Sequence, residues 1–134
     1  MQISKKCEYA LRAMYELAKD KTNTPISVSK IAERQCIPYK FLEQIFSILR
    51  KHNLVKGVSG KNGGYILYSP ANQITIAEIL KAAEGNLNII SCLQGDETCQ
   101  FFHNCDFKNF WTKFNAHIIE FLNFFTLEDI IKGV

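Results

Sequence analysis

The chain has 134 residues, of which 47 % are hydrophobic and 22 % are charged, and it contains five cysteines. This length and apolar content suit one compact domain with its own core, and the lack of any run of about 18 apolar residues argues against a membrane span. We therefore expect a cytoplasmic protein with reduced thiols. In such a protein, three cysteines crowded into residues 91–105 favour metal binding over a disulfide framework.

Charge is divided unevenly along the chain. Residues 1–70 contain 12 Lys and Arg against 5 Asp and Glu, a net charge of +7, whereas residues 71–134 contain 4 against 8, a net charge of −4. A basic half suits contact with a polyanion such as nucleic acid, although a solvated charged face would give the same count.

Residues 5–20 predict a first helix, because apolar residues recur at steps of three and four. We expect Cys7 to be a small buried hydrophobe rather than a ligand, since it lies on the apolar face. On the adjoining stripe, Glu8 and Arg12 have the i, i+4 spacing of a surface ion pair. The whole apolar face consists of Cys7, Ala10, Leu11, Met14, Leu17 and Ala18.

Two further helices are predicted after a turn-like stretch at residues 21–25. Ser27 can cap the first, and Pro38 begins the second, which runs to about Lys51. A short amphipathic pair of this kind is typical of a helix-turn-helix, which presents polar side chains to a DNA major groove. The second helix has an apolar side, Phe41, Leu42, Ile45, Ile48 and Leu49, and a polar side, Tyr39, Lys40, Glu43, Gln44, Ser47, Arg50 and Lys51.

Residues 55–68 predict a β-hairpin with a glycine-rich turn, which would be the wing of a winged helix-turn-helix. The turn does not lead into a Gly-Lys-Ser/Thr helix start, so a nucleotide-binding loop is not expected. Lys56 and Lys61 are placed to meet phosphates or a minor groove.

The second half begins with a helix at residues 75–84, which has Thr75 and Glu78 as a capping box and Gly85 as its stop. Beyond the cysteines, large apolar residues recur at intervals of 4, 3, 4, 3 and 4. Such a heptad seam on about 18 residues, ~27 Å of helix, predicts pairing with a second copy in a two-fold dimer, with packing inside one chain as the alternative. The seam consists of Phe107, Trp111, Phe114, Ile118, Phe121 and Phe125.

These segments, in this order and spacing, resemble the iron-sulfur cluster regulators of the IscR and NsrR type, in the Rrf2 superfamily. The resemblance covers essentially the whole chain and rests on MQISKKCEYALRAMYELA, YKFLEQIFSILRKHNLV, SGKNGGYIL, the three cysteines and the aromatic tail. It implies a mainly α fold with a small β-wing. Its parts would be a winged helix-turn-helix DNA-binding region at 1–70, a linking helix at 71–90, a cysteine-rich cluster-binding loop at 91–106, and a long C-terminal dimerisation helix with its tail at 107–134.

The resemblance implies a homodimeric transcription factor, not an enzyme, that binds a palindromic double-stranded DNA operator. Cys92, Cys99 and Cys105 match the family's ligands for an iron-sulfur cluster, of 2Fe-2S or 4Fe-4S type, and soft thiolates suit iron. Lys108 stands where the IscR type has a histidine ligand. Because the NsrR type uses an acidic residue near the N-terminus of the partner, we expect Glu8 of the partner subunit as the fourth ligand and His103 as the alternative.

The resemblance also assigns DNA-binding residues. Glu43 and Gln44 match recognition-helix positions, where glutamate can accept from cytosine N4 and glutamine can pair with adenine. Ser59 stands where well-studied relatives have an arginine. The other candidates are Ser27, Ser29, Tyr39, Lys40, Ser47 and Arg50 in the helices, and Lys56, Lys61 and Asn62 in the wing.

Such a regulator would sense iron-sulfur, redox or nitric oxide status, and other readings stay open. The three cysteines with His103 could hold zinc in a regulator of the same fold, although no C-x-x-C knuckle is present. A thiol switch acting through disulfide formation is a further alternative, in which Cys36 would take little part because we expect it to be buried beside the turn. An enzyme or electron carrier is disfavoured, since no nucleophile and base pair stands out.

Overall fold

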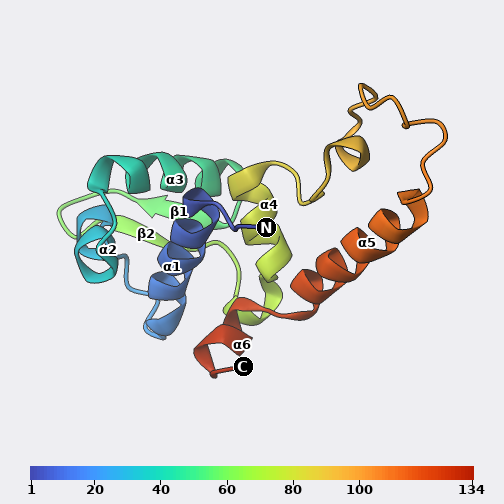
Figure 1. The fold of residues 1–134 in the computed structure, drawn as a ribbon. Coiled ribbons are helices and arrows are strands. Elements are labelled where there is room, and N and C mark those ends of the chain that lie inside the picture. The colour runs from blue at the N-terminus through green and yellow to red at the C-terminus, as the bar shows by residue number, and fades with distance from the viewer.

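The computed structural model describes all 134 residues and has the expected fold class, six α-helices with one two-stranded sheet. The element bounds are α1 (Lys5–Lys19), α2 (Val28–Gln35), α3 (Tyr39–Lys51), β1 (Val55–Val58), β2 (Gly64–Leu67), α4 (Ile76–Glu84), α5 (Lys108–Phe124) and α6 (Leu127–Ile131), with short 3-10 turns η1 (Ala71–Gln73) and η2 (Ser91–Gln94). In Figure 1, α1 to α3 and the hairpin form one body. After α4 the chain extends away from this body, and α5 leads back toward it. None of the helices has the length and apolar character that crossing a membrane requires.

The core lies under α1, α3 and α4, where amphipathic helices bury their apolar faces. On α1, the expected face is confirmed: Cys7 and Met14 are buried, and Leu11 packs half-buried against the core. Burial raises the pKa of the Cys7 thiol, and its Sγ donates to Glu84 Oε2 at 3.3 Å, so Cys7 is a packed, protonated thiol. Phe46, which the sequence analysis did not include in the apolar side of α3, is fully buried.

The wing is an antiparallel hairpin in which Val55 pairs with Leu67 and Val58 with Gly64. A third extended stretch joins it, because Ile26 and Tyr65 exchange two backbone hydrogen bonds of 3.0 and 2.9 Å. Gly64 is required here, since a Cβ at this position would lie 2.3 Å from the Ile26 carbonyl oxygen. The start of α2 is thereby fastened to the wing.

The expected capping box of α4 is confirmed, with Thr75 and Glu78 bonded reciprocally and Gly85 ending the helix at φ 85°. The far end of α5 returns to the same point: Ile76 N donates to the Phe125 oxygen at 3.0 Å, and Leu127 N donates to the Ile74 oxygen at 2.8 Å. We call residues 86–125 the arm. Both of its ends lie at α4, which it follows directly and to whose start it returns through the bond at Phe125.

Candidate functional site

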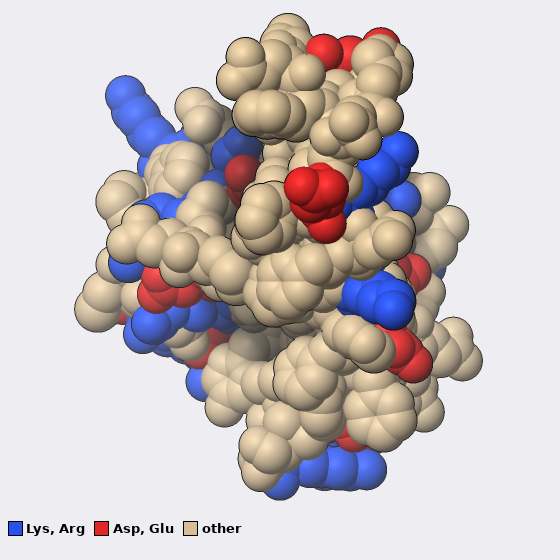
Figure 2. Space-filling model, turned by 45° about the vertical axis from the view of Figure 1, so that its right-hand side comes forward, with Lys and Arg blue, Asp and Glu red and all other residues tan.

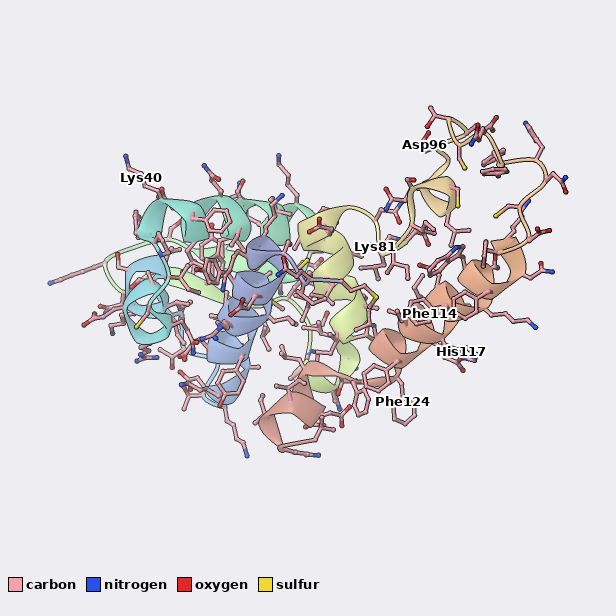
Figure 3. All side chains as sticks on the ribbon, in the orientation of Figure 1. Lys40, Lys81, Asp96, Phe114, His117 and Phe124 are labelled. Atoms are coloured by element: carbon pink, nitrogen blue, oxygen red, sulfur yellow. The ribbon has the colours of Figure 1, made fainter.

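The polar side of α3 is exposed over its whole length, as the helix-turn-helix prediction requires. The exposed residues include Lys40, which extends away from the body of the protein in Figure 3. Tyr39 Oη donates to Glu43 Oε2 at 3.0 Å, and this bond raises the pKa of Tyr39. The other carboxylate oxygen of Glu43, Oε1, is left to accept from a base. The other exposed candidates on this face are Gln44, Ser47 and Arg50.

The remaining DNA-binding candidates lie on α2 and the wing. Ser27 caps α2 by accepting from Lys30 N at 3.2 Å, so its hydroxyl is already engaged, whereas Ser29 is exposed. The ammonium of Lys56 lies 5.0 Å from the ring centroid of Tyr68. The wing candidates, all exposed, are Lys56, Ser59, Lys61 and Asn62.

The turn between α2 and α3 departs from expectation at Cys36, which is exposed rather than buried. Cys36 takes the left-handed conformation at φ 54° to end α2, and the next residue, Ile37, fills the core instead with 4 % exposure. The prediction failed because an apolar residue at a helix end can point either way, and the neighbouring isoleucine buries more apolar surface.

Glu16 of α1 holds the turn between α2 and α3 through its side chain. Its side chain is only 1 % exposed, and it accepts from Lys19 Nζ at 2.9 Å, Gln35 Nε2 at 2.5 Å and Arg34 Nη1 at 3.5 Å. Burial raises the pKa of Glu16, but the hydrogen bonds from Lys19 and Gln35 outweigh it, so the net pKa lies below the usual value. Glu16 is thus an ionised carboxylate that holds the end of α2 against α1.

Glu8, the expected fourth ligand, lies on α1 and does not line the cysteine pocket of its own chain. Its carboxylate accepts from Lys5 Nζ at 3.0 Å and from Arg12 Nη2 at 3.1 Å, and the bond from Lys5 lowers the pKa of Glu8. The expected Glu8 to Arg12 pair is therefore present. Arg12 Nη1 also donates to Gln35 Oε1 at 3.5 Å, so a chain of contacts runs from Glu8 to the residues that Glu16 holds.

The three cysteines of the arm line one apolar pocket of 350 Å³. Cys92 and Cys105 are half-buried, Cys99 is exposed, and all are free thiols. Four other apolar side chains, Leu93, Phe101, Phe102 and Trp111, line the pocket together with Gly95 and Lys108.

The donor chemistry of this pocket, three thiols in an apolar surround, fits an iron-sulfur cluster. The side chains are not gathered, however, since no three Cys, His, Asp or Glu residues of the chain form a group able to hold a metal ion. His103 is exposed and packs edge-on against Phe102, with ring centroids 5.0 Å apart, without lining the pocket. Ligation would therefore require the loop to close.

The aromatic seam of α5 is divided between two surroundings. Trp111, Phe114 and Ile118 are half-buried within the chain, whereas Phe107 and Phe121 are 66 % and 63 % exposed. Figure 2 turns this side toward the viewer, and uncharged residues cover most of the face. The other large exposed side chains of α5 and the C-terminal tail are Phe110 (57 %), Phe124 (77 %), Ile130 (42 %) and Val134 (70 %).

Sequence reasoning missed one buried polar group of the arm. Asn115 is the only buried residue of α5, and its side chain bonds Asn88 and the backbone of Ile89. The available signal was an asparagine four residues after Trp111 and three before Ile118, on the apolar side of the helix, but its partners could not be read from the spacing.

Comparison with known proteins relates the whole chain to one group of regulators. Residues 3–133 match the family model Rrf2, described as iron-dependent transcriptional regulator. The HTH-type transcriptional regulator IscR of Pectobacterium atrosepticum is 36 % identical over 133 residues, which is 99 % of this chain and 80 % of that protein.

Two solved structures have the same fold over nearly their full length. CymR (YrzC), the global cysteine regulator of B. subtilis, superposes with a TM-score of 0.84 at 31 % identity, covering 100 % of this chain and 98 % of that one. IscR of T. potens superposes with a TM-score of 0.81 at 34 % identity, covering 98 % and 87 %.

Proposed function

The chain belongs to the Rrf2 family of transcriptional regulators, and on that premise we propose that it is a homodimeric sensor whose cysteine loop holds an iron-sulfur cluster. The family is one of DNA-binding regulators and not of enzymes, so control of transcription is the class of function. The observation that carries the finer proposal is the pocket shared by Cys92, Cys99 and Cys105.

Dimerisation is supported by apolar surface that one chain leaves uncovered. The exposed phenylalanines of α5 lie on one stretch of 17 helical residues, ~25 Å long. Contiguous exposed aromatics of this kind mark an interaction surface rather than a solvated face. Since a two-fold axis brings the same patch of each copy together, a second α5 is the natural cover. The two recognition helices would then read the two halves of a palindromic operator.

The cluster would be held by the thiolates of Cys92, Cys99 and Cys105. When bound, the cluster would be the part of the protein that responds to iron supply, oxidants and nitric oxide. Lys108 and Trp111 also line the pocket, so a basic and an aromatic side chain would border the cluster. For the fourth ligand we propose Glu8 of the partner subunit, with His103 as the alternative, because Glu8 carries an ionised carboxylate on an accessible part of α1.

Ligation by Glu8 would act on the DNA-binding half through Arg12. Because a bound metal would take up part of the negative charge of the carboxylate, ligation would weaken the 3.1 Å contact between Glu8 and Arg12. Arg12 also contacts Gln35, at the end of α2, so this change would reach the helix-turn-helix. A coupling of about 1–3 kcal/mol, a 5- to 150-fold change in operator affinity, would be sufficient for a switch.

The test is the visible spectrum and iron content of protein purified without oxygen. We expect the charge-transfer absorption of an iron-sulfur cluster in the native protein, its loss in Cys92→Ala, Cys99→Ala or Cys105→Ala, and its retention in Cys36→Ala, which removes an exposed thiol outside the pocket. A Glu8→Gln variant should assemble a less stable cluster. Colourless protein carrying stoichiometric zinc would contradict the proposal in favour of a zinc site.

A thiol switch is the second candidate, favoured by the free thiols of one pocket and by the likeness to CymR, a global cysteine regulator. Free-thiol titration of metal-free protein after oxidant treatment, with operator binding measured in parallel, tests it. Oxidation that joins two of the three cysteines and changes operator affinity supports this candidate, whereas unchanged affinity rejects it.

A further inference from the structure

Asn115 is a buried polar side chain in an otherwise apolar part of α5. It is 6 % exposed, and each of its two side-chain polar atoms has a partner: Oδ1 accepts from Ile89 N at 2.8 Å, and Nδ2 donates to Asn88 Oδ1 at 2.7 Å. Burying an amide costs free energy unless it is hydrogen-bonded, and an apolar residue of similar volume would avoid that cost. The asparagine therefore calls for a role in fixing geometry.

The contacts continue from Asn88 into the turn that carries the first cysteine. Asn88 Nδ2 donates to the backbone oxygen of Leu93 at 2.9 Å, and the backbone oxygen of Asn88 accepts from Gln94 Nε2 at 2.5 Å. Leu93 and Gln94 directly follow Cys92 in η2 (Ser91–Gln94). The backbone around Cys92 is thereby tied to α5 through side-chain amides.

The orientation of both amides is fixed by the backbone groups at the two ends. The Ile89 N–H can only donate, so the atom of Asn115 that meets it must be the oxygen, and its NH₂ must face Asn88. The Leu93 carbonyl can only accept, so the NH₂ of Asn88 must face it. The relay has one consistent arrangement, and it is lost if either amide is removed.

The other two cysteines lack such an anchor. The backbone oxygen of Cys99 accepts from Phe102 N at 2.9 Å, and that of Cys105 accepts from Lys108 N at 3.3 Å, both within the same few residues. The turn at Cys99 stays within the loop, whereas Cys105 is bonded to Lys108, the first residue of α5. The three cysteines are thus held unequally.

We propose that the Asn115–Asn88 pair is a positioning element that fixes Cys92 to α5, so that Cys92 and Cys105 are both held at this helix and Cys99 is the ligand that closes onto them. The inference rests on the proposed cluster site. It adds that the state of this site is communicated to α5, the proposed dimer helix, at Cys92.

The first test uses metal-free protein and therefore does not depend on a cluster. Alkylation by iodoacetamide, followed cysteine by cysteine with mass spectrometry, compares the native chain with Asn115→Leu and Asn88→Ala. We expect the rate at Cys92 to rise about threefold to tenfold, the change that loss of one buried hydrogen bond produces, while the rates at Cys99 and Cys105 stay within error. Cys105, half-buried like Cys92, is the internal control.

Asn123→Ala is the matched control variant, because Asn123 is an exposed asparagine of α5 whose side chain donates only to the Ile119 oxygen of its own helix, at 3.0 Å. It should leave all rates unchanged. A folded Asn115→Leu protein with an unchanged Cys92 rate, or with all three rates raised equally, would overturn the proposal. If Asn115→Leu does not fold, Asn88→Ala decides by the same criteria.

The second test uses cluster-loaded protein. Asn115→Leu should acquire the cluster but lose it faster in air than the native chain and Asn123→Ala do. Equal decay would count against a positioning role. If the native chain itself acquires no cluster, the proposed function fails, and the alkylation rates still decide whether Asn115 holds Cys92.

Discussion

The recognition helix and the cysteine loop are held by different means. α3 has one side buried in the core, with Leu42 and Phe46 completely inaccessible, and its polar side is formed and exposed before any ligand arrives. The cysteines lie on an arm that has one buried residue in α5, and Cys99 is shaped only by a local turn. The DNA-binding half is preorganised, whereas the arm, in the function proposed above, would be completed by a cofactor and a second copy.

The largest effect should come from breaking the preorganised half. Phe46→Ala removes a fully buried ring that stacks on Tyr65 with centroids 4.6 Å apart, and should lower the free energy of unfolding by about 3–5 kcal/mol. Urea denaturation measures it. Phe124→Ala, which truncates an exposed ring of the arm, should have a far smaller effect on the stability of the monomer. An equal loss of unfolding free energy in both variants would mean that the arm contributes as much to the stability of the monomer as the core under α3 does.

Substitutions on the exposed surface of the arm should affect dimer assembly rather than folding. Phe121→Glu combined with Phe124→Glu introduces charge into the exposed aromatic surface, and should give monomers by sedimentation and at least about 100-fold weaker operator binding, since bivalent attachment is lost. Asn123→Glu adds a charge to another face of α5 and serves as the control. A double variant that remains dimeric would place the interface elsewhere.

The third prediction concerns the buried carboxylate of Glu16, which holds the turn between α2 and α3. Glu16→Gln should cost about 1–3 kcal/mol of stability at neutral pH, less than for a fully buried pair because Lys19 and Arg34 are about half exposed. Since the pKa of Glu16 is lowered on folding, its contribution is present above the unfolded value of about 4.3 and is lost as the pH falls through the folded value.

Thermal denaturation between neutral pH and about pH 3 should therefore show a shallower acid decline for Glu16→Gln than for the native chain. Parallel curves would mean that folding does not change the pKa of Glu16. Glu78→Gln, on the exposed side of α4, gives the behaviour of a carboxylate that serves only as a helix cap.

The smallest effect concerns a single phosphate contact. Lys40→Ala should weaken binding to operator and to random DNA by similar factors and reduce the slope of log affinity against log salt by about 1. Lys113→Ala, an equally exposed lysine on α5, should leave the slope unchanged. A Lys40 variant that loses only operator binding would show that Lys40 contacts a base instead.

How far the sequence predicted this molecule depended on whether the signal was local. The capping box of α4 and the hairpin were predicted because neighbouring residues determine caps and turns. Phe46 was missed although it stands four residues after Leu42 and three before Leu49, which places it on the buried side of the helix. Cys36 was misplaced because the choice between it and Ile37 is made by the core. The cysteine motif identified three thiols, but neither their shared pocket nor the Asn115 relay could follow from spacing, since both depend on how the arm folds back.

The fastening of the arm at Thr75 and Thr126 has a consequence for how such proteins can diverge. Because loop-closure entropy grows only with the logarithm of length, inserting a residue between the cysteines costs a small fraction of a kcal/mol once both ends are fixed. Changes in the number of residues between Cys92, Cys99 and Cys105 are then absorbed inside the arm. Lineages could thereby retune what the loop binds by insertion and deletion, while the geometry that reads DNA is inherited unchanged.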